Sequence, residues 1–210
     1  MPMPRKQSTF LAWIVRMSLI KRWALMHSFR RENVSEHSHQ TAVIAHLLCI
    51  IRNRLYGGHA DPQKAATLAI YHEISETKLQ DLNSRTKYMN PEFTRQYKAL
   101  EKMAENECLQ TLPEELREDF RDLLIQDNVD PEYKAIVKAA DLLSAYIKVN
   151  DELRFNNLEF SGVRATLRPR IEGLYESMPE VRYFMDTFID SCWASVDELA
   201  GLDQERAGRP

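Results

Sequence analysis

The chain has 210 residues, of which 44% are hydrophobic and 28% are charged, and these proportions are typical of a globular protein. Its formal net charge of −3 lacks the positive excess that a nucleic-acid-binding surface or a polybasic membrane patch needs. We therefore expect neither a nucleic-acid polymer nor a membrane as a partner. Only six glycines interrupt a sequence dominated by good helix formers, which predicts an all-α fold.

Helix start signals recur along the chain. Asp61-Pro62, Asn90-Pro91 and Asp130-Pro131 each pair a good N-cap residue with proline at the first helical position. Ser35 is the expected cap of a further helix, which Gly57-Gly58 ends. Together with the helical spacing of apolar residues, these signals predict a single bundle of about eight helices, over residues 7–19, 35–55, 62–78, 91–110, 113–126, 131–155, 162–177 and 180–200.

The chain has no internal repeat and no linker long enough to divide it. We expect one domain over residues 1–200 and a frayed polar tail over residues 201–210. The polar segment 79–88 is expected to be a loop, directly after the helix predicted over residues 62–78. Three cysteines without a CxxC motif indicate a reducing compartment, and the apolar stretch 10–20 is too short to span a bilayer, so the expected location is the cytoplasm.

The helix predicted over residues 62–78 turns polar at His72 and Glu73. These neighbours lie about 100° apart around a helix, so both side chains can touch one cation. Glu76 follows His72 by about one turn and falls on the same side, where it can act as an acid or base beside that cation. The alternative is a helix end that turns all three side chains to solvent.

Asp141 lies among apolar and small residues, in a pattern typical of a buried helix. A buried carboxylate needs a partner, which is either a metal ion or a basic side chain such as Lys138. His37 lies in the first turn of its predicted helix, where its imidazole can point out of the helix end. His39 and His46 lie on the opposite side of that helix, so we expect both to be structural.

Two imidazoles and two carboxylates from three helices can complete a four-ligand site for one divalent cation, which lowers the pKa of a bound water and generates a nucleophile. The four residues are His37, His72, Glu73 and Asp141. A guanidinium matches two phosphate oxygens at once, so Arg22 can clamp a phosphate beside the cation. It belongs to a basic cluster, for which the alternative is a solvated turn, formed by Lys21, Arg22, His27, Arg30 and Arg31.

The order of a histidine, a histidine–acid pair and a distant aspartate on helices resembles the HD-domain phosphohydrolases. Within that superfamily the chain is similar to the bacterial 5′-deoxynucleotidases, with spacing kept over nearly the whole chain. The matching segments are residues 21–26 (KRWALM), 32–38 (ENVSEHS), 71–76 (YHEISE), 113–117 (PEELR), 138–146 (KAADLLSAY) and 183–185 (YFM).

The resemblance implies a role for each candidate residue. Glu76 falls on the catalytic acid or base, Asp81 on an acidic catalytic residue that also binds substrate, and Arg22 on the residue that orients the phosphate. Trp23 would press on the sugar and leave no room for a 2′-hydroxyl. The metal-ligand positions are His37, His72, Glu73 and Asp141, and the implied substrate contacts also include His37, Asp141, Gln126, Asp127, Asn128 and Val129.

The implied reaction is hydrolysis of a deoxyribonucleoside 5′-monophosphate to the nucleoside and phosphate by a metal-activated water. The implied cofactor is one divalent cation, either Co²⁺, Mn²⁺, Mg²⁺ or Zn²⁺, because mixed histidine and carboxylate sites accept several such ions. The resemblance also implies a homodimer.

Two features depart from the family pattern. Glu73 stands where the family has aspartate, and its extra methylene moves the carboxylate by about one C–C bond length. The stretch 80–85 reads Gln-Asp-Leu-Asn-Ser-Arg where the family usually has Gly-Asp-Leu-Pro-Thr-Pro. Two alternatives therefore stay open: a hydrolase for another substrate, such as a deoxynucleoside triphosphate or another phosphorylated metabolite, and a nucleotide-binding module that has lost its activity.

Overall fold

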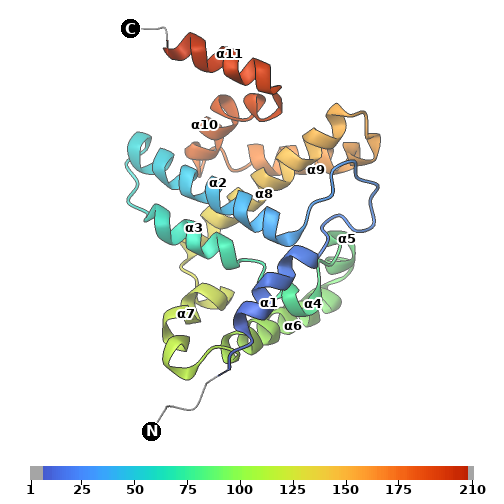
Figure 1. The fold of residues 1–210 in the computed structure, drawn as a ribbon, viewed down its shortest axis with the longest axis vertical. Helices are drawn as coiled ribbons and strands as arrows, with labels where there is room; N and C mark the ends of the chain where they lie inside the picture. The colour runs from blue at the N-terminus through green and yellow to red at the C-terminus, as the bar shows by residue number, and fades with distance from the viewer. Residues whose placement is uncertain (1–6, 208–210) are drawn as a thin grey trace.

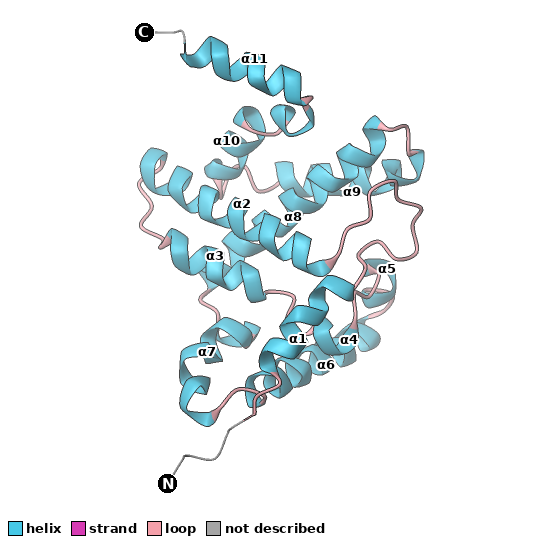
Figure 2. Cartoon of the chain, in the orientation of Figure 1, coloured by secondary structure: helices cyan, strands magenta, loops and turns pink. Residues whose placement is uncertain are grey.

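The computed structural model describes residues 7–207, and this part of the chain is all-α (Figure 1). Apart from one isolated antiparallel bridge between Lys21 and Asn33, the described residues contain no β-structure, as Figure 2 shows. The α-helices are α1 (Phe10–Arg16), α2 (Val34–Leu55), α3 (Pro62–Tyr71), α4 (Glu76–Leu79), α5 (Ser84–Lys87), α6 (Pro91–Gln110), α7 (Arg117–Leu124), α8 (Pro131–Arg154), α9 (Ser161–Glu172), α10 (Pro179–Thr187) and α11 (Val196–Ala207). Short 3₁₀ helices are η1 (Met17–Leu19), η2 (Glu114–Leu116), η3 (Gln126–Asn128), η4 (Leu158–Phe160) and η5 (Asp190–Trp193).

The all-α bundle is confirmed, and all three predicted Asx-Pro starts cap helices. The side chain of Asp61 accepts from the backbone of α3, that of Asn90 from α6 and that of Asp130 from α8. The prediction that Ser35 caps α2 is wrong. Asn33 caps this helix in a reciprocal box with Glu36, in which each side chain accepts from the other residue's backbone N–H.

Three expected boundaries are wrong, and each adds a helix to the predicted eight. The helix expected over 62–78 breaks into α3 and α4, and the loop expected over 79–88 contains α5. The helix expected over 180–200 ends as α10 at Thr187, and Ser195 caps the separate helix α11 through a reciprocal pair of hydrogen bonds with Glu198. Helix α11 then continues to Ala207, past the boundary expected at residue 200; residues 208–210 of the expected tail lie outside the described part.

Two hydrophobic clusters meet at the turn between α3 and α4. The larger one joins α2, α3, α8, α9 and α10, and it contains Leu68 and Ala69 of α3. The smaller one joins α1, α6 and α7, and it contains Ile74, which is fully buried. The turn that carries His72 and Glu73 is therefore held between two cores, which fixes it without regular secondary structure. None of the described helices combines the length and the apolar character that a bilayer crossing requires.

Candidate metal centre and substrate site

Four side chains from three parts of the fold converge beside this turn. His37 comes from α2, His72 and Glu73 from the turn after α3, and Asp141 from α8. One potential ligand atom from each lies within 4.8 Å of the others. The structure thus brings together the whole set that the sequence analysis selected as metal ligands, and Glu73 reaches the cluster despite its extra methylene.

The hydrogen bonds around His37 fix which ring nitrogen carries its proton. Its Nδ1 lies 3.1 Å from Ser144 Oγ, and that hydroxyl donates to Gln40 Oε1 at 2.9 Å. The hydroxyl therefore accepts from Nδ1–H, which leaves a lone pair on Nε2 of the neutral ring. Burial, and then the charge of Arg22, lowers the pKa of His37 despite the opposing effect of Asp141, so the ring is neutral at pH 7.

His72 is oriented in the same way, by the backbone. Its Nδ1 lies 2.6 Å from the carbonyl oxygen of Ala69, which can only accept. A continuous helix would offer that carbonyl to the backbone N–H of Glu73, so this bond accounts for the end of α3 at Tyr71. The ring's Nε2 is buried without a hydrogen-bond partner and faces the cluster.

The neighbouring ligand atoms are close enough for one cation to contact them all. His37 Nε2 lies 3.2 Å from Asp141 Oδ1, and His72 Nε2 lies 3.3 Å from Glu73 Oε1. In the assigned tautomers all four atoms are acceptors, so each close pair is repulsive unless a positive charge bridges it. Burial alone would lower the pKa of His72, yet the neighbouring carboxylates of Glu73 and Asp141 outweigh it and raise this pKa. The donor set therefore fits a divalent cation.

Asp141 has the basic partner that was one of the two alternatives, and it also faces the cluster that could hold a metal ion. Its Oδ1 faces His37 in the cluster, while its Oδ2 accepts from Lys138 Nζ at 2.6 Å. The Lys138 side chain is 61% exposed, so the Asp141 carboxylate lies between the solvent-facing ammonium of Lys138 and the buried ring of His37. A lysine on the outer oxygen orients the inner oxygen toward the cluster, as outer partners of metal-binding carboxylates do.

Two further carboxylates lie beside the cluster. Glu76, the first residue of α4, has a buried Oε2 without a hydrogen-bond partner. Burial, followed by the charges of Glu73 and Asp81, raises the pKa of Glu76 well above its usual range. Burial also raises the pKa of Asp81, while Arg22 and the backbone N–H of Trp23 oppose that shift. The turn toward solvent that was the alternative for Glu76 is thus not what the structure has.

Arg22 and Trp23 lie on the irregular segment between η1 and α2, and neither is freely solvated. The guanidinium of Arg22 sits 5.7 Å from the centre of the Trp23 ring, and its Nη1 is 3.5 Å from Glu32 Oε2. Buried Glu152 of α8 anchors this segment by accepting from the backbone N–H groups of Phe29 at 2.9 Å and Arg30 at 3.1 Å. For Arg22, the solvated-turn alternative is wrong, because its side chain is only 13% exposed.

The segment Gln126–Val129 lies elsewhere. Gln126 donates its backbone N–H to Glu105 Oε2 of α6 at 3.1 Å, and Asp127 pairs with Lys102 at 2.8 Å. Among the described residues, no recorded contact joins this segment to the four-residue cluster. The structure does not bring it to the site, and its proposed contact with substrate rests on the resemblance.

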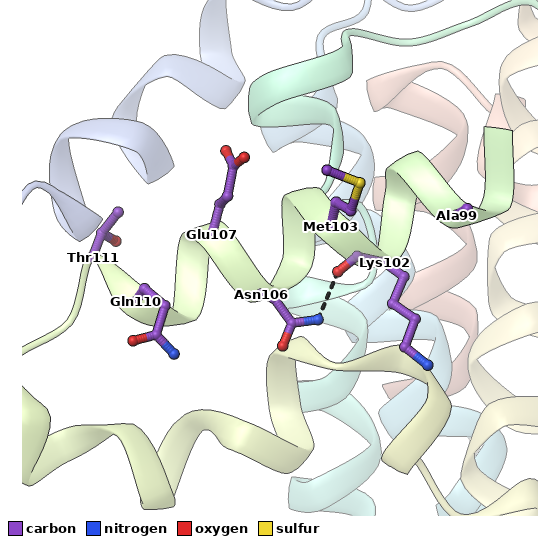
Figure 3. Close-up of a pocket in the computed structure, with 7 residues that line it drawn as sticks. All are labelled: Ala99, Lys102, Met103, Asn106, Glu107, Gln110 and Thr111. Carbon is purple, nitrogen blue, oxygen red and sulfur yellow. Dashed lines mark hydrogen bonds between the residues drawn. The ribbon is translucent and has the colours of Figure 1, made fainter. Parts of the chain in front are cut away.

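Two surface hollows differ in their relation to the four-residue cluster. One, of about 690 Å³, runs along the outer face of α6 and is lined by residues such as Met103 and Gln110, none of which belongs to the site (Figure 3). The other, of about 680 Å³, lies between α2, α8 and α10. Its polar end includes Glu32 and Gln40, the residues that contact Trp23 and Ser144.

Sequence reasoning missed three residues that support the site. Ser144 follows Asp141 by three positions and Gln40 follows His37 by three, so each lies on the same helix face as a proposed ligand, although Ser144 contacts His37 on the other helix. That spacing is a signal, although nothing in the sequence shows that α2 and α8 face each other. Glu32 was within a matching segment, but only the bridge between Lys21 and Asn33 brings it opposite Arg22.

The fold and the four-residue cluster define a class. An HD-domain phosphohydrolase from Listeria innocua superposes with a TM-score of 0.77 at 18% identity, covering 95% of this chain and 97% of that one. A cyanophage S-2L HD phosphohydrolase bound to dA and one catalytic Zn²⁺ ion gives a TM-score of 0.64 at 16% identity, covering 86% and 96% of the two chains. This protein therefore has the fold of the HD-domain phosphohydrolases.

Sequence comparison gives the family. The family model described as 5′-deoxynucleotidase YfbR-like matches residues 9–192. A 5′-deoxynucleotidase of Shewanella oneidensis is 46% identical over 194 residues, covering 91% of this chain and 97% of its own. One of Vibrio cholerae is 43% identical over 195 residues, covering 93% and 100%. The chain belongs to the YfbR-like 5′-deoxynucleotidase family, which confirms the resemblance.

Proposed function

We propose that this protein hydrolyses deoxyribonucleoside 5′-monophosphates to the deoxyribonucleoside and phosphate, with one divalent cation held by His37, His72, Glu73 and Asp141. The observation that carries this proposal is the set of facing acceptor atoms, 3.2 and 3.3 Å apart, between which a bound cation would fit. Family membership supplies the substrate class. A divalent cation bound there would activate water as a nucleophile near neutral pH and neutralise charge on the phosphate.

The chain's own residues supply the remaining functions. Arg22 orients the phosphate, because its buried Nη1 has no hydrogen-bond partner and is available to an anionic oxygen. Glu76 lies beside the proposed ligands, and burial, the first cause of its raised pKa, favours the protonated carboxyl that is needed to protonate the 5′-oxygen of the leaving nucleoside. Asp81 accepts a hydrogen bond from the sugar, and the indole of Trp23 excludes a 2′-hydroxyl.

Glu73 serves as a ligand in this proposal. Its carboxylate oxygen lies within 4.8 Å of the other three ligand atoms, which supports glutamate in the position where the family pattern has aspartate. We further propose that the protein is a cytoplasmic homodimer that binds a small deoxynucleotide and no nucleic-acid polymer. The described cysteines are all free thiols, in keeping with a reducing compartment, and light scattering after gel filtration tests the dimer.

Product analysis tests the proposed reaction. The purified protein is incubated with dAMP or AMP and with Co²⁺, Mn²⁺, Mg²⁺ or Zn²⁺, and nucleoside and phosphate are quantified. Turnover of dAMP in preference to AMP, dependent on a divalent ion, is the expected result. Release of pyrophosphate or triphosphate from dATP without turnover of dAMP would favour a hydrolase for another substrate. Tight dAMP binding without turnover in any ion would favour a binding module.

A further inference from the structure

Glu32 contacts both residues that are proposed to select the substrate. Its backbone carbonyl accepts from the N–H of Arg22 at 3.0 Å, next to the bridge between Lys21 and Asn33. Its side chain, 9% exposed, accepts from Trp23 Nε1 at 2.8 Å through Oε2. The same oxygen lies 3.5 Å from Arg22 Nη1. One largely buried carboxylate therefore faces the guanidinium and the indole together.

The backbone of Trp23 is strained, and its surroundings hold it there. Its φ of 57° lies in the left-handed region, which is unfavourable for a bulky side chain. The indole N–H is tied to Glu32, and the ring meets Phe160 edge-on with 5.5 Å between the ring centres. Because strain of this kind persists only where several contacts enforce it, these contacts fix the indole plane rather than merely bury the ring.

The distance to Arg22 has a separate consequence. At 3.5 Å, Glu32 offsets the guanidinium charge, yet Nη1 has no hydrogen-bond partner among the described residues. The carboxylate thus holds the guanidinium next to the indole without occupying the N–H that an anionic oxygen would use. The contact with Arg22 depends on the negative charge of Glu32, whereas the indole N–H of Trp23 needs only a hydrogen-bond acceptor.

We propose that Glu32 is a positioning residue that sets the Trp23 indole against the sugar and the Arg22 guanidinium against the phosphate. Through these two contacts it controls both discrimination against ribonucleotides and affinity for the phosphate. This inference rests on the proposed deoxynucleotidase function. It assigns sugar selection to the pair of Trp23 and Glu32 rather than to the indole alone.

Two substitutions separate the two contacts. Glu32→Gln keeps an acceptor for the indole but loses the ion pair that holds Arg22 in place, so KM for dAMP should rise while the ratio of kcat/KM for AMP over dAMP stays within about twofold of wild type. Glu32→Ala loses both contacts, so KM should rise and this ratio should increase by about tenfold or more, the loss expected for one hydrogen bond to a charged group. If Glu32 served stability alone, the AMP to dAMP ratio of kcat/KM would not change in Glu32→Ala, and glutamine would have no altered ratio to restore.

Glu36→Gln is the matched control, since Glu36 caps the same helix start and its recorded contact is with the backbone of Asn33. It should lower stability without changing the ratio. The indole N–H signal of Trp23 in a ¹⁵N–¹H spectrum, assigned with Trp23→Phe, should shift in Glu32→Ala and not in Glu36→Gln.

An unchanged AMP to dAMP ratio in Glu32→Ala would overturn the inference, as would an equal change in Glu36→Gln. If Glu32→Ala does not fold, the KM of Glu32→Gln decides, and a KM equal to wild type refutes the role at Arg22. If the wild-type protein turns over no nucleotide, the proposed function fails by itself. In that case the ratio of the calorimetric dissociation constants for dAMP and AMP replaces the kinetic ratio, and it tests Glu32 separately.

Discussion

Gln80 has a backbone conformation that glycine adopts at lower cost. It ends α4 with φ 64° and ψ 169°, a region that is essentially reserved for glycine. The side chain is exposed and makes no recorded hydrogen bond, while the backbone N–H donates to Glu76 O at 2.8 Å and would do so in any variant. This is also the position at which the family pattern has glycine. Replacing Gln80 with glycine should therefore stabilise the protein.

The magnitude follows from two opposing effects. Relief of a non-glycine residue from this region is worth on the order of 1–3 kcal/mol. The greater freedom of glycine in the unfolded chain removes about 0.5–1 kcal/mol of that gain. Gln80→Gly should thus raise the free energy of unfolding by about 1 kcal/mol, or Tm by about 2–4 °C for a chain of this size.

Urea unfolding followed by circular dichroism measures this change, with two controls. Gln80→Ala removes the same side chain but keeps a Cβ in the strained conformation, so it should bring no gain. Gln96→Gly lies on the exposed face of α6 and should lower stability by about 1 kcal/mol. The reasoning is refuted if Gln80→Gly is no more stable than wild type, or if Gln80→Ala is equally stabilised.

Three further predictions concern the cluster, the sugar contact and a buried acid outside the site. His72→Ala should abolish metal binding, measured by elemental analysis, and turnover, while the helical circular dichroism spectrum persists; an active variant with full metal content would contradict the ligand assignment. Trp23→Ala should raise the AMP to dAMP ratio of kcat/KM, and an unchanged ratio would remove Trp23 from sugar selection. For Glu105, burial is the main cause that raises the pKa from 4.5 to about 7, so the folded state keeps a proton that the unfolded state releases between these values, and stability falls as pH rises through this window. Because Glu105 is partly screened by solvent, the free energy of unfolding should fall by about 1–2 kcal/mol over this window. Urea unfolding of Glu105→Gln at pH 5 and pH 8 should lack this fall. A pH dependence equal to that of wild type would contradict the assignment to Glu105.

The helices that begin with a local signal were predictable from the sequence. Asp61, Asn90 and Asp130 act within three residues, so the starts of α3, α6 and α8 follow from neighbouring side chains alone. The capping pair of Ser195 and Glu198 is an equally local signal for the start of α11. The end of α3 was not predictable in this way, because it depends on the ring of His72 taking the Ala69 carbonyl.

In the candidate site, too, some residues could be predicted from the sequence and others could not. Residue type and helix spacing were enough to select His37, His72, Glu73 and Asp141, because imidazoles and carboxylates are among the few side chains that bind divalent metal ions. The residues that orient them carry no such chemical restriction. Ser144 acts on His37 from 107 positions away, so its role depends on the packing of α8 against α2, which only the tertiary structure gives.

Metal titration coupled to turnover tests the central claim most directly. Protein stripped of metal with a chelator is titrated with Mn²⁺, while bound metal and phosphate release from dAMP are measured in the same samples. If the four side chains hold one catalytic cation, turnover starts near zero and rises in proportion to bound metal until one ion per chain is bound. Full turnover by the stripped protein, or metal bound at one equivalent without turnover of dAMP, would contradict the account.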